Sequence, residues 1–238
     1  MAVTTTGGPV LLGLAPGSHE GTDPWAGFLE ELTGRGLGAP LLVITDGAPG
    51  LCSAVELAVP GSLRQRCLIH RARNLLAKVP THAQAEVKQA FWQIFDDLDA
   101  PPGDQAVSEA RRRADAFAGR YRKRSPTAVS CLLDTLPELT VFLGFPREHW
   151  HRIRHTNLIE RTFGETRRRT KVIGRLPGER SCLSLVWAVL DRASRGWRGV
   201  TQTPAGVRLL QDLRRDLRLS PHRQPDKEVT HSPVTAAA

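Results

Sequence analysis

The stretch from Leu41 to His70 constrains the fold more than any other part of the chain. It opens with an apolar run that stops at Thr45-Asp46-Gly47, a pattern that predicts a buried strand ending in a carboxylate and a tight turn. Functional side chains of open α/β sheets gather at the carboxyl ends of strands, so Asp46 is the first candidate site residue. The alternative is that Asp46 only caps the turn, which is a common use of Asp-Gly.

A helix and a second strand complete this unit. We expect a helix over 51–58, which ends before the break at Pro60-Gly61. A strand is expected over 63–69, and its end carries the pattern Cys67-x-x-His70. A short strand predicted over 9–15 and a helix over 25–33 precede the unit. The order of these elements indicates α/β packing.

The charge balance points to a polyanionic partner. Lys and Arg number 33 against 24 Asp and Glu, giving a net charge of +9. Arginine makes bidentate contacts with phosphate, which favours nucleic acid, although a generally basic proteome would give the same balance. The four separated cysteines, the absence of an apolar run of membrane length and a start without a secretory pattern predict a soluble, cytoplasmic protein with no membrane partner.

Most of the remaining chain reads as helical. Segments from Arg71 to Pro146 have helical character, separated by prolines, and basic and aromatic residues cluster over 147–155. Further helices are expected over 156–170, 181–197 and 204–217. From Ser220 the composition predicts a disordered tail.

Glu160 stands out on the helix expected over 156–170. At 100° per residue, Gly164, Arg167 and Lys171 lie on the same line. A mostly apolar stripe beside that line is expected to be buried; it consists of Ile159, Phe163, Thr166, Thr170 and Ile173. A carboxylate followed by cations suits a metal ligand next to a phosphate backbone. The alternative is a solvated helix with salt bridges, and Glu165 is expected to pair with a neighbouring arginine.

Cys67-x-x-His70 could begin a zinc site, but a structural zinc site usually has two close ligand pairs and no second pair is present. A half-buried strand end is the favoured interpretation. Local signatures of Ser-His-Asp or Cys-His hydrolysis, a P-loop and a dinucleotide-binding fingerprint are also missing.

The spacing Asp46-x3-Gly50-Leu51-x6-Ala58-Val59-Pro60-x-Ser62-x2-Gln65-x-Cys67-x2-His70 resembles the signature of Mutator-type insertion-sequence transposases at every fixed position. The block HWHRIRHTNLIERTFGETRRRTKVI, residues 149–173, resembles the Asn-x-x-Glu-Arg block of the same family. Weaker similarity extends the resemblance over roughly residues 8–200.

The resemblance implies a mostly helical α/β fold with a partial ribonuclease-H-like core that an all-helical insertion interrupts. The implied divisions are residues 1–70 for the first part of the core, 71–152 for the insertion, 153–200 for core helices with the glutamate and a basic cluster, and 201–238 for a last helix and tail.

The resemblance also implies a three-carboxylate site that uses Mg²⁺ or Mn²⁺. Asp46 corresponds to its second aspartate and Glu160 to its glutamate, while Cys67 and His70 form a signature pair with an architectural role. The residues expected to contact DNA are Arg161, Arg167, Arg168, Arg169, Lys171, Trp150 and His151. Trp150 and His151 would stack on bases, and packing is the alternative for Trp150.

The family's first aspartate should precede the strand at 9–15, where MAVTTTGG contains no acid. We therefore expect a truncated transposase that is inactive alone and acts on transposon ends and target DNA as a homo-oligomer or with a full-length transposase. Alternatives are a non-catalytic DNA-binding regulator and a metal-dependent nuclease that cleaves without joining.

Overall fold

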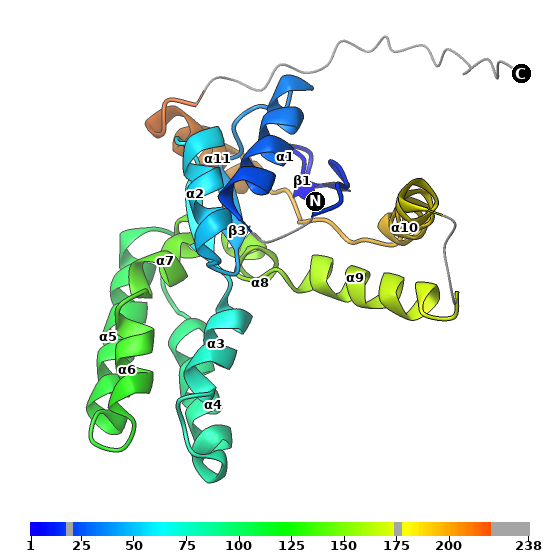
Figure 1. Ribbon diagram of the computed structural model, residues 1–238. Helices are drawn as coiled ribbons and strands as arrows, with labels where there is room; N and C mark the ends of the chain where they lie inside the picture. The colour runs from blue at the N-terminus through cyan, green and yellow to red at the C-terminus, as the bar shows by residue number, and fades with distance from the viewer. Residues whose placement is uncertain (18–20, 174–177, 220–238) are drawn as a thin grey trace, which may run out of the picture.

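A computed structural model describes residues 1–17, 21–173 and 178–219 of the protein. It shows a mixed α/β part, a block of helices projecting from it, and three later helices (Figure 1). This arrangement agrees with the expected mostly helical α/β class. The ribonuclease-H-like core and the domain boundaries stay predictions, and the predicted tail from Ser220 lies outside the described residues.

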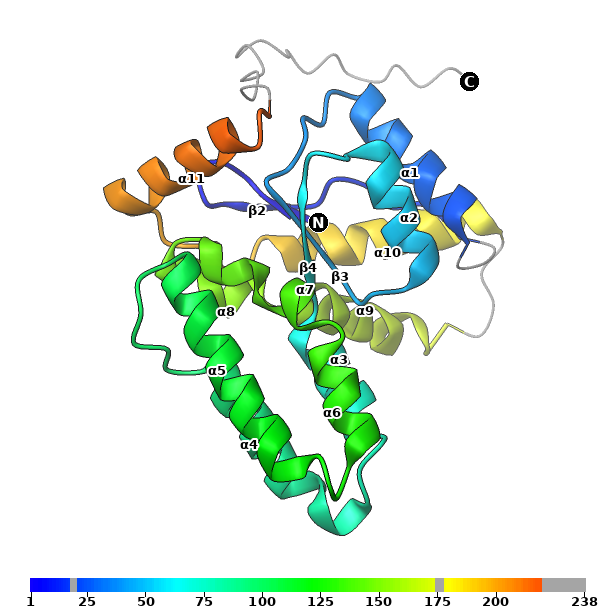
Figure 2. The same ribbon diagram turned by 90° about the vertical axis from the view of Figure 1, so that its left-hand side faces the viewer.

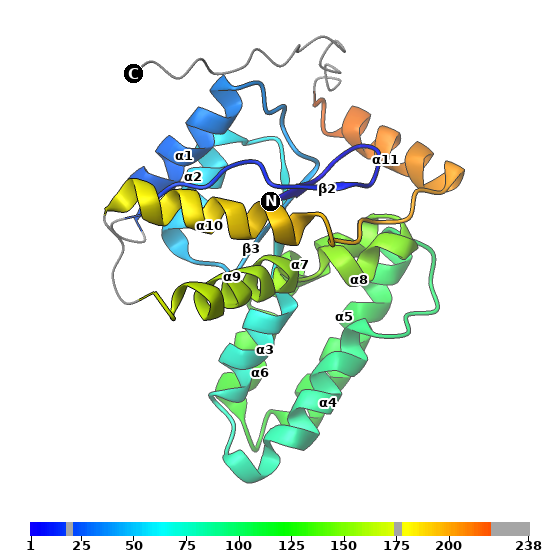
Figure 3. The same cartoon turned by 90° about the vertical axis from the view of Figure 1, so that its right-hand side faces the viewer.

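The α/β part contains two small sheets. Strands β1 (Ala2–Val3) and β2 (Pro9–Val10) pair antiparallel, and strands β3 (Leu42–Thr45) and β4 (Leu63–Arg66) pair parallel. Helix α2 (Pro49–Ala58) connects β3 to β4, as the strand–helix–strand pattern predicts. Helix α1 (Thr22–Gly34) packs against α2. These two helices lie on one side of the parallel strands and α10 lies on the other (Figures 2 and 3).

Two predicted strands are shorter than the sequence suggests. The strand expected over 9–15 ends at Val10, and the Leu12 carbonyl instead accepts a hydrogen bond from Arg35, the residue that follows α1. The strand expected over 63–69 ends at Arg66, because helix α3 begins at Leu68. Leu68, Ala72 and Leu75 of that helix are buried at helical spacing, so this apolar pattern belongs to a helix.

The helical block contains six α-helices and three short 3₁₀ helices. Their bounds are α3 (Leu68–Leu76), η1 (Thr81–Ala83), α4 (Gln84–Phe95), α5 (Asp104–Tyr121), α6 (Pro126–Leu133), α7 (Leu136–Thr140), η2 (Val141–Gly144), η3 (Arg147–His149) and α8 (Trp150–Ile153). One hydrophobic core joins these elements from Leu68 to Trp150. It is rich in aromatic contacts, such as that between Phe91 and Phe95 with ring centroids 5.3 Å apart.

Gln65 ties the parallel strands to this block. Its side chain is fully buried in β4 and donates to the Leu139 carbonyl at 3.1 Å, while its Oε1 accepts from the Phe142 amide at 2.8 Å. Because buried amides are stable only when paired, these contacts fix β4 against α7 and η2.

Three later helices complete the described chain: α9 (Asn157–Thr170), α10 (Glu179–Ser194) and α11 (Pro204–Asp216). Helix α9 packs against α10. The segment before α11 is fastened to the helical block, because Thr203 Oγ1 donates to Glu148 Oε1 at 2.6 Å and the Thr201 carbonyl lies 2.8 Å from His149 Nε2.

No single described helix is long and apolar enough to cross a membrane. The bent pair formed by Pro126–Leu133 and Leu136–Gly144 meets the length and composition criteria together, and its buried side chains belong to the core of the helical block.

Candidate functional site

The carboxyl ends of β3 and β4 form the edge on which the candidate site is built. Asp46 follows the last residue of β3 and Cys67 follows the last residue of β4, and these last residues, Thr45 and Arg66, are partners in the parallel register. The Cys67 amide donates to the Thr45 carbonyl at 2.8 Å, which extends the pairing by one step. Asp46 and Cys67 therefore leave the sheet at the same edge.

Asp46 is exposed and makes the turn contact that the sequence offered as its alternative role. Its Oδ1 accepts a hydrogen bond of 2.9 Å from the Ala48 amide, at the residue that precedes α2. Gly47 has a φ of +90°, and a Cβ there would lie 2.4 Å from the guanidinium carbon of Arg66. The turn therefore requires glycine, and it keeps the Asp46 carboxylate at the open side of the edge.

Glu160 reaches this edge from α9. The Arg154 carbonyl accepts from the Leu68 amide at 3.0 Å, and the Thr156 amide donates to Cys67 Sγ at 3.4 Å, so the start of α9 is joined to the end of β4. Thr156 Oγ1 then donates to Glu160 Oε1 at 2.7 Å. The Glu160 side chain is 30% exposed, so its carboxylate is fixed from the protein side and open from the solvent side.

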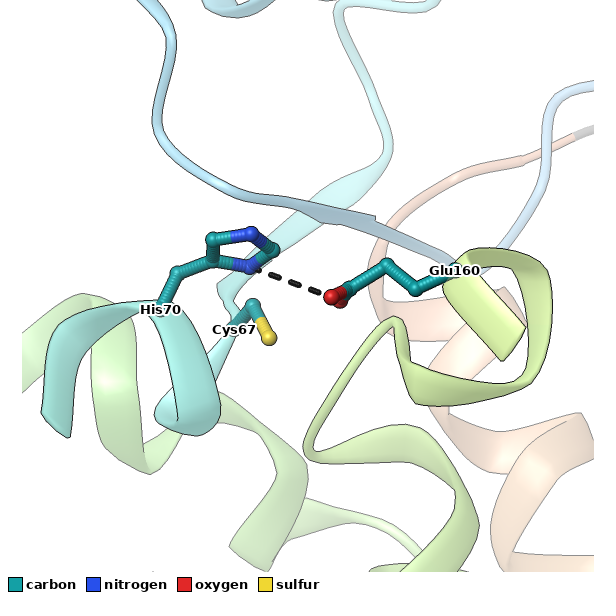
Figure 4. A group of neighbouring side chains, drawn as sticks. All are labelled: Cys67, His70 and Glu160. Atoms are coloured by element: carbon teal, nitrogen blue, oxygen red, sulfur yellow. Dashed lines mark ion pairs between the residues drawn. The ribbon is translucent and has the colours of Figure 1, made fainter. Parts of the chain in front are cut away.

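Cys67, His70 and Glu160 form one compact group, with a ligand atom of each residue within 4.8 Å of the others (Figure 4). His70 lies on α3 and not at a strand end, and its Nδ1 is 3.7 Å from Glu160 Oε1. Cys67 is fully buried at the position that precedes α3, rather than half-buried. Among the described residues this is the one group of three or more metal-ligating side chains, and Asp46 is not a member.

A cation from another helix contacts Glu160. Arg73 on α3 places Nη1 3.4 Å from Glu160 Oε2, a contact that no sequence pattern indicated because the two residues lie on different helices.

The sequence also did not indicate Thr156 as a hydrogen-bond partner of Glu160. Its position just before a helix suggests a cap for backbone amides, whereas its hydroxyl is used on the Glu160 side chain.

The basic residues of α9 divide into paired and unpaired cations. As expected, Glu165 accepts a hydrogen bond of 2.8 Å from Arg169 Nε and also pairs with Arg168. These contacts lower the pKa of Glu165, and the hydrogen bond from Arg169 has the largest effect. The other three expected DNA-contacting cations of this segment are exposed and have no carboxylate partner in the described chain; they are Arg161, Arg167 and Lys171.

The predicted apolar stripe of α9 is wrong in part. Phe163 and Ile173 are 44% and 39% exposed, and the buried positions are Thr162 and Thr166. Threonine can replace a larger apolar side chain here because each hydroxyl donates to a carbonyl of its own helix: Thr162 to Leu158 at 2.8 Å and Thr166 to Thr162 at 3.0 Å. No polar atom of these two side chains is left unpaired.

Trp150 and His151 lie in different surroundings. Trp150 is 8% exposed, its indole N–H donates to the Phe145 carbonyl at 2.7 Å, and its ring meets Phe142 edge-on with centroids 5.9 Å apart. These contacts correct the base-stacking expectation for Trp150 in favour of packing. His151 is exposed and contacts His155, whose pKa is lowered by burial first and by the nearby Arg154 charge.

Comparison with known proteins identifies the family to which the chain is similar. The family model described as "Transposase, Mutator family" matches residues 1–199. The transposase for insertion sequence element IST2 of Acidithiobacillus ferrooxidans is 33% identical over 231 residues, which cover 94% of this chain and 76% of the relative.

Two further relatives show the same relation. The transposase for IS6120 of Mycolicibacterium smegmatis is 34% identical, over 84% of this chain and 60% of the relative. The transposase for ISRM5 of Rhizobium meliloti is 31% identical, over 79% of this chain and 45% of the relative. The chain thus spans between 45% and 76% of the length of these relatives.

Proposed function

Because the chain belongs to the Mutator family of transposases, we propose that it serves metal-dependent cleavage and strand transfer of the DNA of an insertion sequence, in the cytoplasm. The observation that carries this proposal is the position of Glu160 beside the sheet edge at which Asp46 follows β3. Two carboxylates from distant parts of the chain thus serve one edge of a sheet, where α/β folds place their sites.

Asp46 and Glu160 are the residues proposed to hold Mg²⁺ or Mn²⁺. Both side chains offer carboxylate oxygens, the donors that hard divalent cations prefer, and both are open to solvent. When bound, such an ion supplies the Lewis-acid chemistry of phosphodiester transfer, activating the attacking hydroxyl and stabilising the leaving oxygen. The Asp46 turn and the Thr156 hydroxyl orient the two carboxylates before DNA arrives.

Arg161, Arg167 and Lys171 are proposed to bind the phosphate backbone. They are exposed on the helix that carries Glu160, and no ion pair within the described chain neutralises them. Arg168 and Arg169 contribute less, because Glu165 already compensates their charge. Exposed His151 is proposed to lie beside the DNA near the start of the same helix.

We propose that this chain alone does not complete the reaction. Asp46 and Glu160 are two of the three carboxylates that the resemblance implies, and the group around Glu160 contains a single carboxylate. The chain would therefore act with a full-length transposase of the same element, which carries all three carboxylates, whether or not it also binds copies of itself.

The test is a nicking and joining assay on DNA that carries the ends of the element, with Mg²⁺ or Mn²⁺. We expect no nicking by the chain alone, and more joined product when the chain is added to full-length transposase than the latter gives alone. The increase should vanish for Asp46→Ala and for Glu160→Ala. Strong nicking by the chain alone would contradict the proposed inactivity.

A non-catalytic regulator is the second candidate, and the turn contact of Asp46 favours it, because that carboxylate already has a structural use. A regulator would bind DNA with a salt-dependent affinity that survives Asp46→Ala and Glu160→Ala. It would lower the activity of the full-length transposase whether or not those residues are substituted. The same assay therefore separates the two functions.

A further inference from the structure

The three side chains grouped around Glu160 offer sulfur, nitrogen and oxygen donors. We propose that Cys67, His70 and Glu160 form a binding site for a borderline-soft divalent cation of the Zn²⁺ class, different in ligands and metal preference from the carboxylate site proposed above. Thiolate and imidazole select metals of this class, whereas Mg²⁺ prefers oxygen ligands.

The distance between His70 and Glu160 is close to that between two ligands of a coordinated ion. Bond lengths of about 2.0–2.3 Å to Zn²⁺ place tetrahedral ligand atoms about 3.3–3.6 Å apart. His70 Nδ1 and Glu160 Oε1 are 3.7 Å apart, and all three ligand atoms lie within 4.8 Å of one another. The group would close around an ion by side-chain rotations of His70 and Glu160, and their partial exposure, about 30% for each, leaves room for such rotations.

His70 Nδ1 gives independent support for a ligand at this position. The atom is buried and has no hydrogen-bond partner among the residues that the structure describes. Its distance of 3.7 Å from Glu160 Oε1 is too long for a hydrogen bond. A buried ring nitrogen without a partner is costly, and coordination of a cation between Nδ1 and the carboxylate would satisfy it.

The surroundings of Cys67 hold its sulfur beside the other two ligands. The residue is fully buried at the position that precedes α3, the helix that carries His70. The Thr156 amide donates to this sulfur at 3.4 Å. That donor orients the sulfur in the way that outer partners orient metal ligands.

The group leaves room for a fourth ligand and has one competitor. Three protein ligands leave one tetrahedral position, which the exposed side of Glu160 opens to water. Arg73 Nη1 is 3.4 Å from Glu160 Oε2, and its side chain is 62% exposed, so it can turn into solvent when a cation takes its place.

Glu160 cannot serve both metal sites fully at the same time. An ion held by Cys67 and His70 would therefore withdraw Glu160 from the proposed Asp46 site and lower Mg²⁺-dependent activity. This consequence rests on the proposed function, whereas binding of the ion does not, so the test below uses no DNA.

Co²⁺ is the probe, because a cobalt–thiolate bond gives a charge-transfer absorption that oxygen and nitrogen ligands do not give. We expect the chain to show this band and to saturate at one Co²⁺ per chain, with Zn²⁺ displacing it. Cys67→Ser should remove the band, and His70→Gln and Glu160→Gln should each weaken Co²⁺ binding by at least about tenfold. Cys182→Ser is the matched control, since Cys182 lies on α10 outside the group.

The variants at His70 and Glu160 keep the test decisive if loss of the buried Cys67 thiol disturbs folding, because both side chains are partly exposed. Zn²⁺ should also raise the thermal unfolding temperature of the wild-type chain and of Cys182→Ser, but not that of His70→Gln. Absence of the charge-transfer band in the wild type would overturn the proposal. A band that survives Cys67→Ser and disappears in Cys182→Ser would overturn it as well.

Discussion

Gln65 links the strands that carry the candidate site to the helical block through two buried hydrogen bonds. The substitution Gln65→Leu keeps the side-chain volume and removes every polar contact of the side chain. It leaves the Phe142 amide and the Leu139 carbonyl, which now pair with Gln65 at 2.8 Å and 3.1 Å, without these partners in the core.

The expected cost follows from those two groups. A buried donor or acceptor that loses its partner costs about 1–3 kcal/mol, and the added apolar burial of leucine returns about 1 kcal/mol. We therefore expect Gln65→Leu to lower the free energy of unfolding by about 3 kcal/mol. Equilibrium unfolding in urea, followed by far-UV circular dichroism, measures this change as a lower midpoint at an unchanged slope.

The matched control is Gln93→Leu, because Gln93 lies exposed on α4. Its effect should stay within about 0.5 kcal/mol. If Gln65→Leu has an effect as small as that of Gln93→Leu, the reasoning about the buried amide is refuted.

Three further predictions concern DNA binding by exposed cations, the dependence of stability on pH, and the conformation of the turn at Gly47. The double substitution Arg167→Ala with Lys171→Ala should weaken DNA binding and reduce the slope of log affinity against log salt concentration by about 2. Fluorescence anisotropy over a series of salt concentrations measures this slope, and Arg112→Ala should leave it unchanged. A hydrogen bond from Thr203 lowers the pKa of Glu148 in the folded chain. The ionised Glu148 should therefore stabilise the fold above the usual pKa of a glutamate, and this stabilisation should be lost as the pH falls through the lowered pKa. Urea unfolding at pH values from 7 to 3 should show that the stability of Glu148→Gln depends less on acid than that of the wild type. Gly47→Ala should lower the free energy of unfolding by at least about 1 kcal/mol, because φ there is +90° and the added carbon meets a neighbouring side chain; an unchanged urea midpoint would contradict this.

The sequence predicts the strands and helix that carry Asp46, because the patterns that determine them lie within short stretches of the chain. The apolar run before Asp46 and the breaks around α2 predict a strand, a helix and a second strand, which the structure confirms as β3, α2 and β4 and shows to be paired parallel. The pairing of Glu165 with arginines is confirmed as well, because residues three and four apart on a helix are neighbours whatever surrounds them.

The sequence cannot predict contacts between distant helices. Cys67-x-x-His70 shows two ligand types at close spacing, and its third neighbour, Glu160, comes from a helix far along the chain. The contact from Arg73 is hidden for the same reason. The burial of Thr162 in place of Phe163 depends on hydroxyl contacts within α9, which hydrophobic periodicity does not take into account.

The central claim is that Glu160 brings a metal-binding carboxylate to the edge of the sheet that carries Asp46. The most direct measurement is anomalous diffraction from crystals of the chain grown with Mn²⁺. We expect a peak at the carboxyl ends of β3 and β4, bound by Glu160 and Asp46. A fully occupied peak elsewhere, with Glu160 still paired to Arg73, would contradict it.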